Sequence, residues 1–136
     1  MTGDSLTGLA MIIGLGVDVI EVTRIADVIG KHGVHFLRHV FTADEQAGAP
    51  ESHVAAAAYY AGRWCAKEAV AKALGTGIGT ECTWHDIEIV RWPSGQPAVR
   101  LHGAGARTAD RLGVRHIHVS ISHERNLACA SVVAEG

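Results

Sequence analysis

The segment GRWCAKEAVAKALG, residues 62–75, carries the charged side chains best placed to act on a phosphate ester. On a helix, Glu68 and Lys72 lie one turn apart on one face, and so do Arg63 and Lys67. Small and apolar residues surround these charges, so part of the helix should be packed. A carboxylate and several cations near a packed surface, followed by a glycine-rich loop, suit a pyrophosphate with Mg²⁺. The alternative for Glu68 and Lys72 is an ion pair on a solvated helix face.

Asp18 is a second carboxylate whose position suggests a role. It follows the apolar run of residues 11–17, whose length and β-branched content predict a buried strand that stops at Asp18. A helical period begins soon afterwards at Val22, so one role for Asp18 is to cap that helix. The other is to hold a ligand at the sheet edge, and a hard oxygen donor suits Mg²⁺.

Histidines near the C-terminus offer further chemistry. The segment Ser120-Ile121-Ser122-His123 ends a predicted strand, but no GxSxG elbow or acid partner supports a nucleophile and base. Two roles remain for His123, which are binding a phosphate and forming an ordinary hydrogen bond at a hairpin edge. His116 and His118 share one strand face, and we expect a polar sheet surface there in preference to a soft-metal pair.

One segment is more basic than the rest of the chain. Arg24, Lys31 and Arg38 lie within residues 22–41 together with three histidines, and Asp27 is the only acid there. A positive surface on a mildly acidic protein suits an acidic partner. The alternative is a solvated face without a partner.

The elements that must position these residues are mixed. A capping box at Thr42 and Glu45 predicts a short helix, and Ser52 and Gly75 bound the longest one. The other predicted elements are helices near 22–33 and 103–112 and strands at 87–92, 97–101, 116–122 and 127–134. Predicted hairpins favour an α+β fold with a mainly antiparallel sheet against one long and several short helices.

Length and composition exclude several classes of protein. The 136 residues, 48% of them hydrophobic, suit one globular domain, which we place at residues 11–136 after a mobile leader, residues 1–10. A net charge of −2 argues against a nucleic-acid binder, and no apolar run reaches the roughly 18 residues of a membrane span. Three scattered cysteines indicate a reducing compartment, so we expect a cytoplasmic protein.

Taken together, these residues resemble the holo-acyl carrier protein synthase family, the bacterial type of 4′-phosphopantetheinyl transferase. The matching motifs run in order along almost the whole chain, at residues 12–18 with Arg24, 41–45, 63–69 with Lys72 and Gly75, 95–97, and 120–123. One departure is Gln96, which stands where many relatives have a basic residue before the proline of the hairpin turn.

The resemblance implies a reaction and an assembly. Such enzymes transfer 4′-phosphopantetheine from coenzyme A (CoA) to a serine of an apo acyl carrier protein, for fatty acid biosynthesis, and release adenosine 3′,5′-bisphosphate. It also implies the 4′-phosphopantetheinyl transferase fold and a homotrimer with CoA sites between subunits.

The resemblance further implies roles for individual residues. Asp18 and Glu68 would hold Mg²⁺ against the pyrophosphate, and Lys72 would neutralise phosphate charge. Arg63 and His123 would hold other CoA phosphates, with Gly75 and Pro97 also at the CoA site. Lys67 would only support the motif, and the serine proton would pass to Glu68 or to a metal-bound water. The acidic carrier protein would dock on Arg24, Lys31 and Arg38.

Two other functions remain open from the residues. A Mg²⁺-dependent hydrolase of nucleotide pyrophosphates would share the metal and phosphate residues but would not need the basic segment. A carrier-protein-binding module without catalysis would not need both carboxylates.

Overall fold

The computed structural model describes residues 9–136, so most of the predicted leader lies outside the described residues. The elements follow one another as β1 (Ile12–Glu21), α2 (Val22–His32), α3 (Val34–Val40), α4 (Ala43–Ala47), α5 (His53–Ala73), the 3₁₀ helix η1 (Trp84–Asp86), β2 (Ile87–Arg91), β3 (Pro97–Leu101), α6 (Gly103–Leu112), β4 (His116–Glu124) and β5 (Leu127–Glu135).

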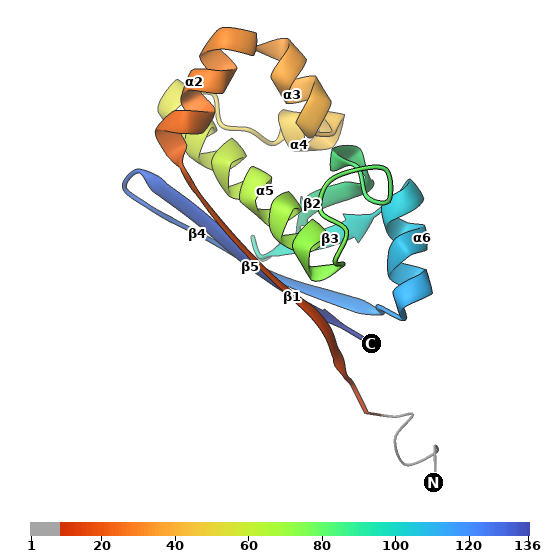
Figure 1. Cartoon of the computed structure of the whole chain (residues 1–136). Coiled ribbons are helices and arrows are strands. Elements are labelled where there is room, and N and C mark those ends of the chain that lie inside the picture. The colour runs from red at the N-terminus through yellow and green to blue at the C-terminus, as the bar shows by residue number, and fades with distance from the viewer. Residues whose placement is uncertain (1–8) are drawn as a thin grey trace, which may run out of the picture.

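The strands form two antiparallel sheets. One has the order β1-β5-β4, and the other is the hairpin of β2 and β3. Helix α5 crosses one face of the larger sheet, α2 and α3 gather at one end of it, and α6 flanks the hairpin (Figure 1). The predicted α+β fold with antiparallel pairing is confirmed, although the strands divide between two sheets.

The core lies between α5 and the larger sheet. Alternate residues of β5, such as Ala128 and Val132, are fully or almost fully buried against the alanines of α5. The opposite face of the sheet is open, and Leu15, Val17 and Val19 on β1 are 66%, 65% and 61% exposed. Our prediction of a buried first strand was therefore wrong, because a helix covers only one face of this antiparallel sheet.

Local sequence signals account for most of the helix ends. Both arms of the Thr42–Glu45 capping box are present, and the Ser52 side chain accepts a hydrogen bond from the Ala55 amide. Helix α2 ends at Gly33, whose φ of 49° favours glycine. The short helix α3, which follows at once, was not predicted.

Candidate active site

Glycines on β1 bring that strand directly onto α5. A Cβ atom on Gly14 would overlap the backbone carbonyl oxygen of Ala73, and one on Gly16 would overlap that of Ala69. Two strand residues advance about 6.7 Å and four helix residues about 6 Å, so every second residue of β1 meets a successive turn of α5. Asp18, the next inward residue, therefore reaches the following turn of the helix.

An ion pair with Lys72 on α5 shows that Asp18 faces this helix. Burial, followed by the negative charge of Asp18, raises the pKa of the Cys65 thiol to about 12. Asp18 lies inside β1, which runs on to Glu21, and Glu21 is the residue that precedes α2. The predicted strand end at Asp18 and its alternative role as a helix cap were both wrong.

Asp18, Glu68 and Lys72 form one cluster, which we call the open cluster. The Lys72 Nζ lies 2.9 Å from the Asp18 Oδ1 and donates to the Val17 carbonyl oxygen at 3.0 Å. Partial burial, and then the negative charge of Asp18, raise the pKa of Glu68, while Lys72 opposes this. Among residues 9–136 no ion pair joins Lys72 to Glu68, so the simple helix-face pair is not formed.

The open cluster has the chemistry of a magnesium site. The Asp18 Oδ2 is buried and has no hydrogen-bond partner in the part of the chain that the structure describes. Mg²⁺ is commonly held by one or two carboxylates, with substrate phosphates and water completing an octahedral shell. No group of three or more histidine, cysteine or acidic side chains among residues 9–136 could hold a metal alone. Asp18 and Glu68 therefore fit a Mg²⁺ ion whose remaining ligands are phosphate oxygens and water.

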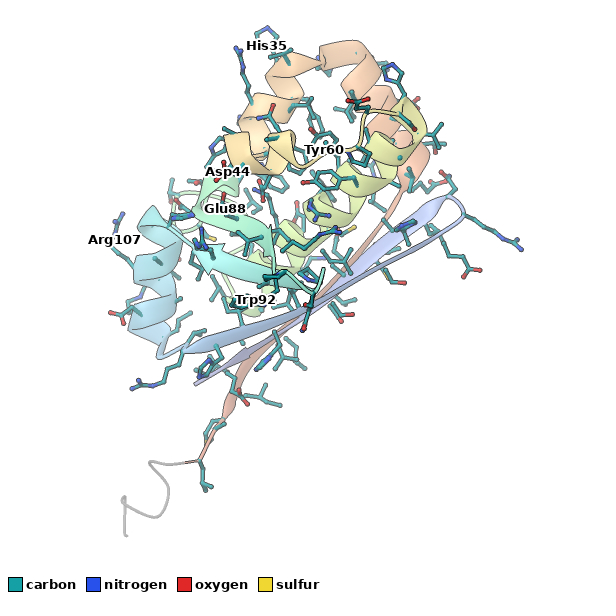
Figure 2. All side chains as sticks on the ribbon, turned by 180° about the vertical axis from the view of Figure 1, so that it is seen from behind. His35, Asp44, Tyr60, Glu88, Trp92 and Arg107 are labelled. Atoms are coloured by element: carbon teal, nitrogen blue, oxygen red, sulfur yellow. The ribbon has the colours of Figure 1, made fainter. Side chains whose placement is uncertain are left out.

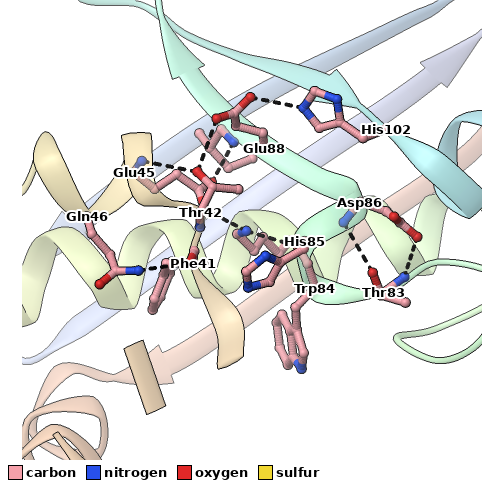
Figure 3. A network of polar contacts seen from close by, with 12 residues as sticks. Phe41, Thr42, Glu45, Gln46, Thr83, Trp84, His85, Asp86, Glu88 and His102 are labelled. Carbon is pink, nitrogen blue, oxygen red and sulfur yellow. Dashed lines mark hydrogen bonds and ion pairs between the residues drawn. The ribbon is translucent and has the colours of Figure 1, made fainter. Parts of the chain in front are cut away.

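Lys67, the neighbour of Glu68, points to another part of the molecule. Its side chain is 0% exposed, and its Nζ lies 2.7 Å from the Glu45 Oε1 and donates to the Trp84 carbonyl oxygen. Glu45 also accepts from the Thr42 and Ile89 amides. We call Lys67 and Glu45 the closed cluster, and it belongs to a polar network that continues to Glu88 and His102 (Figure 3). Its role in the structure is to join α4 and β2 to α5.

Arg63 is buried and forms no ion pair within residues 9–136. It is 6% exposed, its guanidinium carbon lies 3.8 Å from the centre of the Tyr59 ring, and its Nε lacks a partner in the described part of the chain. The Tyr59 hydroxyl donates to the Glu45 carbonyl oxygen at 2.6 Å, which fixes the ring. Burial is the main reason that the Arg63 pKa is lowered. A buried, unpaired guanidinium is a candidate anion site.

A cavity of about 410 Å³ lies beside Arg63, and we call it the basic cavity. Arg91, Pro97 and His123 also line it, and no acidic residue does. Its size is within the usual range for small-molecule sites. The His123 side chain makes no hydrogen bond to the described residues. The alternative role for His123, an ordinary hydrogen bond at a hairpin edge, is therefore not seen within residues 9–136. Gly75 ends α5 with a φ of 79° and does not line this cavity.

Sequence reasoning missed two residues of the basic cavity, Arg91 and Tyr59. A signal for Tyr59 was present, because an aromatic residue four positions before Arg63 on a helix shares its face. Arg91 gave no such signal, since its place at the cavity depends on how the hairpin meets α5.

The basic segment forms an exposed surface at one end of the molecule. Arg24 and Lys31 lie on α2 and Arg38 on α3, and all three residues are exposed. Among residues 9–136, none of them forms an ion pair with a carboxylate. Figure 2 shows His35 at the same end, pointing outward from α3.

Comparisons with known proteins identify a family. A model described as the 4′-phosphopantetheinyl transferase superfamily matches residues 14–132. The chain is 43% identical over 125 residues to a holo-[acyl-carrier-protein] synthase of Koribacter versatilis, covering 92% of this chain and 99% of that protein. It is 46% identical over 123 residues to the synthase of Natranaerobius thermophilus, covering 90% and 97%.

Solved structures agree. The holo-[acyl-carrier-protein] synthase of Neisseria meningitidis superimposes with a TM-score of 0.84 at 32% identity, over 91% of this chain and 98% of that one. The Helicobacter pylori synthase in complex with coenzyme A gives a TM-score of 0.79 at 28% identity, over 88% and 98%. Sequence and structure together show that the chain belongs to the 4′-phosphopantetheinyl transferase superfamily and, within it, to the holo-acyl carrier protein synthases.

Proposed function

We propose that the chain transfers 4′-phosphopantetheine from CoA to a serine of an apo acyl carrier protein, for fatty acid biosynthesis. The serine oxygen forms a bond to the phosphorus that carries the pantetheine, and the bond from that phosphorus to adenosine 3′,5′-bisphosphate breaks. The observation that carries this proposal is the open cluster, with its unpartnered Asp18 oxygen, in a protein that also has a basic cavity.

The open cluster supplies the groups that phosphoryl transfer needs. Asp18 and Glu68 would hold Mg²⁺, which when bound offsets the charge of the pyrophosphate. The Lys72 side chain is 48% exposed, so it can donate to a phosphate oxygen as well as to Asp18. We assign Glu68 as the acceptor of the serine proton. Positioning and charge stabilisation then account for the rate.

The basic cavity suits the nucleotide half of CoA. Arg63 offers a cationic donor there, the His123 ring offers a further nitrogen, and Pro97 contributes part of the wall. Gly75 lies outside this cavity, so we keep it as a contact of the CoA chain near the end of α5. The Helicobacter pylori relative was solved in complex with coenzyme A, which supports this ligand.

The exposed cations of α2 and α3 suit an acidic carrier protein. We propose that Arg24, Lys31 and Arg38 form the docking surface. Reversing one charge, Arg24→Glu, should raise the KM for the carrier about tenfold and leave the KM for CoA unchanged. Steady-state kinetics with each substrate varied will measure this, and equal effects on both KM values would argue against docking there.

We propose that the chain assembles as a homotrimer with its sites at the subunit interfaces. The open face of the larger sheet carries Leu15, Val17, Val19 and Leu127, all more than half exposed. An apolar patch of this kind commonly marks a protein interface. His123 lines both the basic cavity and a second cavity that includes Val19 and Leu127, so the patch adjoins the site. Light scattering of the full chain will give the mass of the assembly.

No helix within residues 9–136 is long and apolar enough to cross a membrane. Cys65, Cys82 and Cys129 are unpaired within the described chain, with Cys129 exposed. We propose a cytoplasmic location, where thiols stay reduced.

One assay tests the function. The protein is mixed with Mg²⁺, CoA and apo carrier protein, and the mass of the carrier is followed. We expect the gain of one phosphopantetheinyl group. CoA cleavage without a carrier would favour the pyrophosphate hydrolase, and carrier binding without a mass gain would favour a non-catalytic module.

A further inference from the structure

The turn between β4 and β5 holds an arginine in an unusual backbone conformation. Glu124 pairs with Leu127 in the register of the two strands, so only Arg125 and Asn126 form the turn. Two-residue turns of this kind need a positive φ at their first central residue, where glycine, asparagine or aspartate is usual. Arg125 has a φ of 54°, and no other residue except glycine within residues 9–136 has a positive φ. The conformation costs an arginine free energy, which points to a function for its side chain.

Asn126, the other residue of the turn, ties the hairpin to the start of α2. Its backbone carbonyl oxygen accepts a hydrogen bond from the Val22 amide at 2.8 Å. Its side-chain oxygen accepts from the Thr23 amide at 3.0 Å, and its side-chain nitrogen donates to the Thr23 hydroxyl at 3.0 Å. Glu21, which precedes α2, makes no side-chain cap bond, so Asn126 supplies the missing cap from a distant part of the chain. These contacts hold the turn, and with it the Arg125 backbone, in place.

The same contacts place Arg125 beside the proposed docking surface. Arg24 directly follows Thr23, and Arg125 directly precedes Asn126, so each arginine is next to one residue of this hydrogen-bonded pair. Figure 1 shows the tip of the β4–β5 hairpin at the point where β1 passes into α2. A typical protein interface takes in about 20–30 residues from each partner, so one docked protein can contact both arginines.

Acidic residues near the turn leave the Arg125 charge available. Arg125 is exposed and forms no ion pair with a carboxylate within residues 9–136. Glu21 and Glu124 both lie opposite Leu127 in the sheet register, so their side chains share the open face of the larger sheet with it. Helix α2 instead packs against α5, which covers the other face. Asp27 is the only acid on α2 itself, so the cations outnumber the acids on the docking side.

We propose that Arg125 is a further contact of the acidic carrier protein, next to Arg24, and that it helps to select that partner. This inference rests on the proposed function, because it takes the carrier as the substrate. The contacts of Asn126 with α2 stabilise the turn in the conformation that presents Arg125 to solvent. A guanidinium can bind a carboxylate of the partner through two hydrogen bonds. An exposed charge of this kind acts mainly on the rate of association.

The test separates the charge of Arg125 from the shape of the turn. Arg125→Gly removes the charge and suits the positive φ, whereas Arg125→Lys keeps both the charge and the strain. Arg107→Gln is the matched control for net charge, because Arg107 is exposed on α6 at the opposite side of the molecule from this turn (Figure 2). Steady-state kinetics are measured with the carrier and with CoA varied, at low salt and in about 0.5 M salt. Thermal denaturation and light scattering follow the fold and the assembly.

We expect Arg125→Gly to raise the KM for the carrier about fivefold at low salt, with the kcat and the KM for CoA unchanged. This difference should shrink in about 0.5 M salt, because salt screens exposed charges. The melting temperature should not fall, since glycine adopts a positive φ without steric cost. Arg125→Lys and Arg107→Gln should keep the wild-type KM values.

Three outcomes would overturn the role of Arg125. These are an unchanged carrier KM in Arg125→Gly, an equal rise in Arg125→Lys, and a rise that comes with a lower melting temperature. A change in the mass of the assembly would overturn it as well and make Arg125 a subunit contact, because Arg125 also lines the second cavity beside the apolar patch. Transfer by the wild-type protein is measured alongside, and its absence would instead overturn the proposed function.

Discussion

Helix α5 carries two clusters of opposite charges, and adjacent residues of the helix belong to different ones. In the closed cluster, Lys67 and Glu45 are almost completely buried, and both have additional hydrogen bonds. In the open cluster, Lys72 is half exposed and the Asp18 Oδ2 has no partner among residues 9–136. Both clusters combine one lysine with carboxylate side chains, and they differ in whether the buried carboxylate oxygens have partners among the described residues.

This contrast separates a structural ion pair from a functional one. A buried charge is tolerated when its partners are complete, and removing one partner then leaves the other charge uncompensated. A cluster that leaves one oxygen without a partner and one cation exposed to solvent can instead bind a further ligand. We therefore expect substitutions in the closed cluster to affect folding and those in the open cluster to affect transfer.

The largest effect should come from the carboxylates of the open cluster. Asp18→Ala or Glu68→Ala should lower the transfer rate at least about a thousandfold, because phosphoryl transfer depends on charge stabilisation by the metal and its ligands. The rate is measured by the mass gain of the carrier at limiting Mg²⁺, with circular dichroism as the check on folding.

Asp110→Ala is the matched control, since Asp110 is an exposed acid on α6 outside both clusters and outside the proposed docking surface. Its transfer rate should equal that of the wild type. A near-normal rate in either Asp18→Ala or Glu68→Ala would remove the metal assignment from the open cluster.

Breaking the closed cluster should act on stability. Lys67→Met leaves the Glu45 carboxylate buried without its cation and should lower the free energy of unfolding by about 3–5 kcal/mol. Urea denaturation will measure this. The control on the same helix is Lys72→Met, which removes an ion pair whose lysine is half exposed and should cost less, about 1 kcal/mol. If both lysines contributed equally to stability, the distinction between the clusters would be wrong.

Local signals in the sequence were sufficient for most elements of the fold. The capping box at Thr42, the cap at Ser52 and the left-handed Gly75 and Gly113 each act over a few neighbouring residues, so the chain itself specifies those ends. The open face of β1 was not predictable in this way, because an apolar strand looks the same whether one or both of its faces are covered.

The site was only partly predictable for the same reason. Glu68 and Lys72 share a helix face by their spacing, but Asp18 lies 50 positions away, and its place depends on the close approach of β1 at Gly16. Spacing also put Lys67 beside Arg63 without showing that its partner is Glu45. The residue types indicated phosphate chemistry, whereas only tertiary contacts show which charges are already satisfied.

The smallest effect concerns the stability of the open cluster itself. Folding raises the pKa of Glu68 above its ordinary value of 4.5. At a pH between the ordinary and the raised pKa, Glu68 keeps its proton in the folded protein and loses it in the unfolded chain. The free energy of unfolding therefore falls as the pH rises from below 4.5 through the raised pKa. Glu68→Gln has no carboxylate at this position and so does not lose stability in this way as the pH rises. With Mg²⁺ chelated, its free energy of unfolding should match that of the wild type at pH 4 and exceed it at pH 7.

The gain should be less than about 1 kcal/mol, because Glu68 is only half-buried and water screens its charge. Thermal denaturation at both pH values will measure it, and transfer by the same variant should be lost. A Glu68→Gln protein that is less stable than the wild type at pH 7 would mean that Glu68 is already satisfied, as Glu45 is. The open cluster would then be closed as well, and its residues would have no free capacity to bind Mg²⁺.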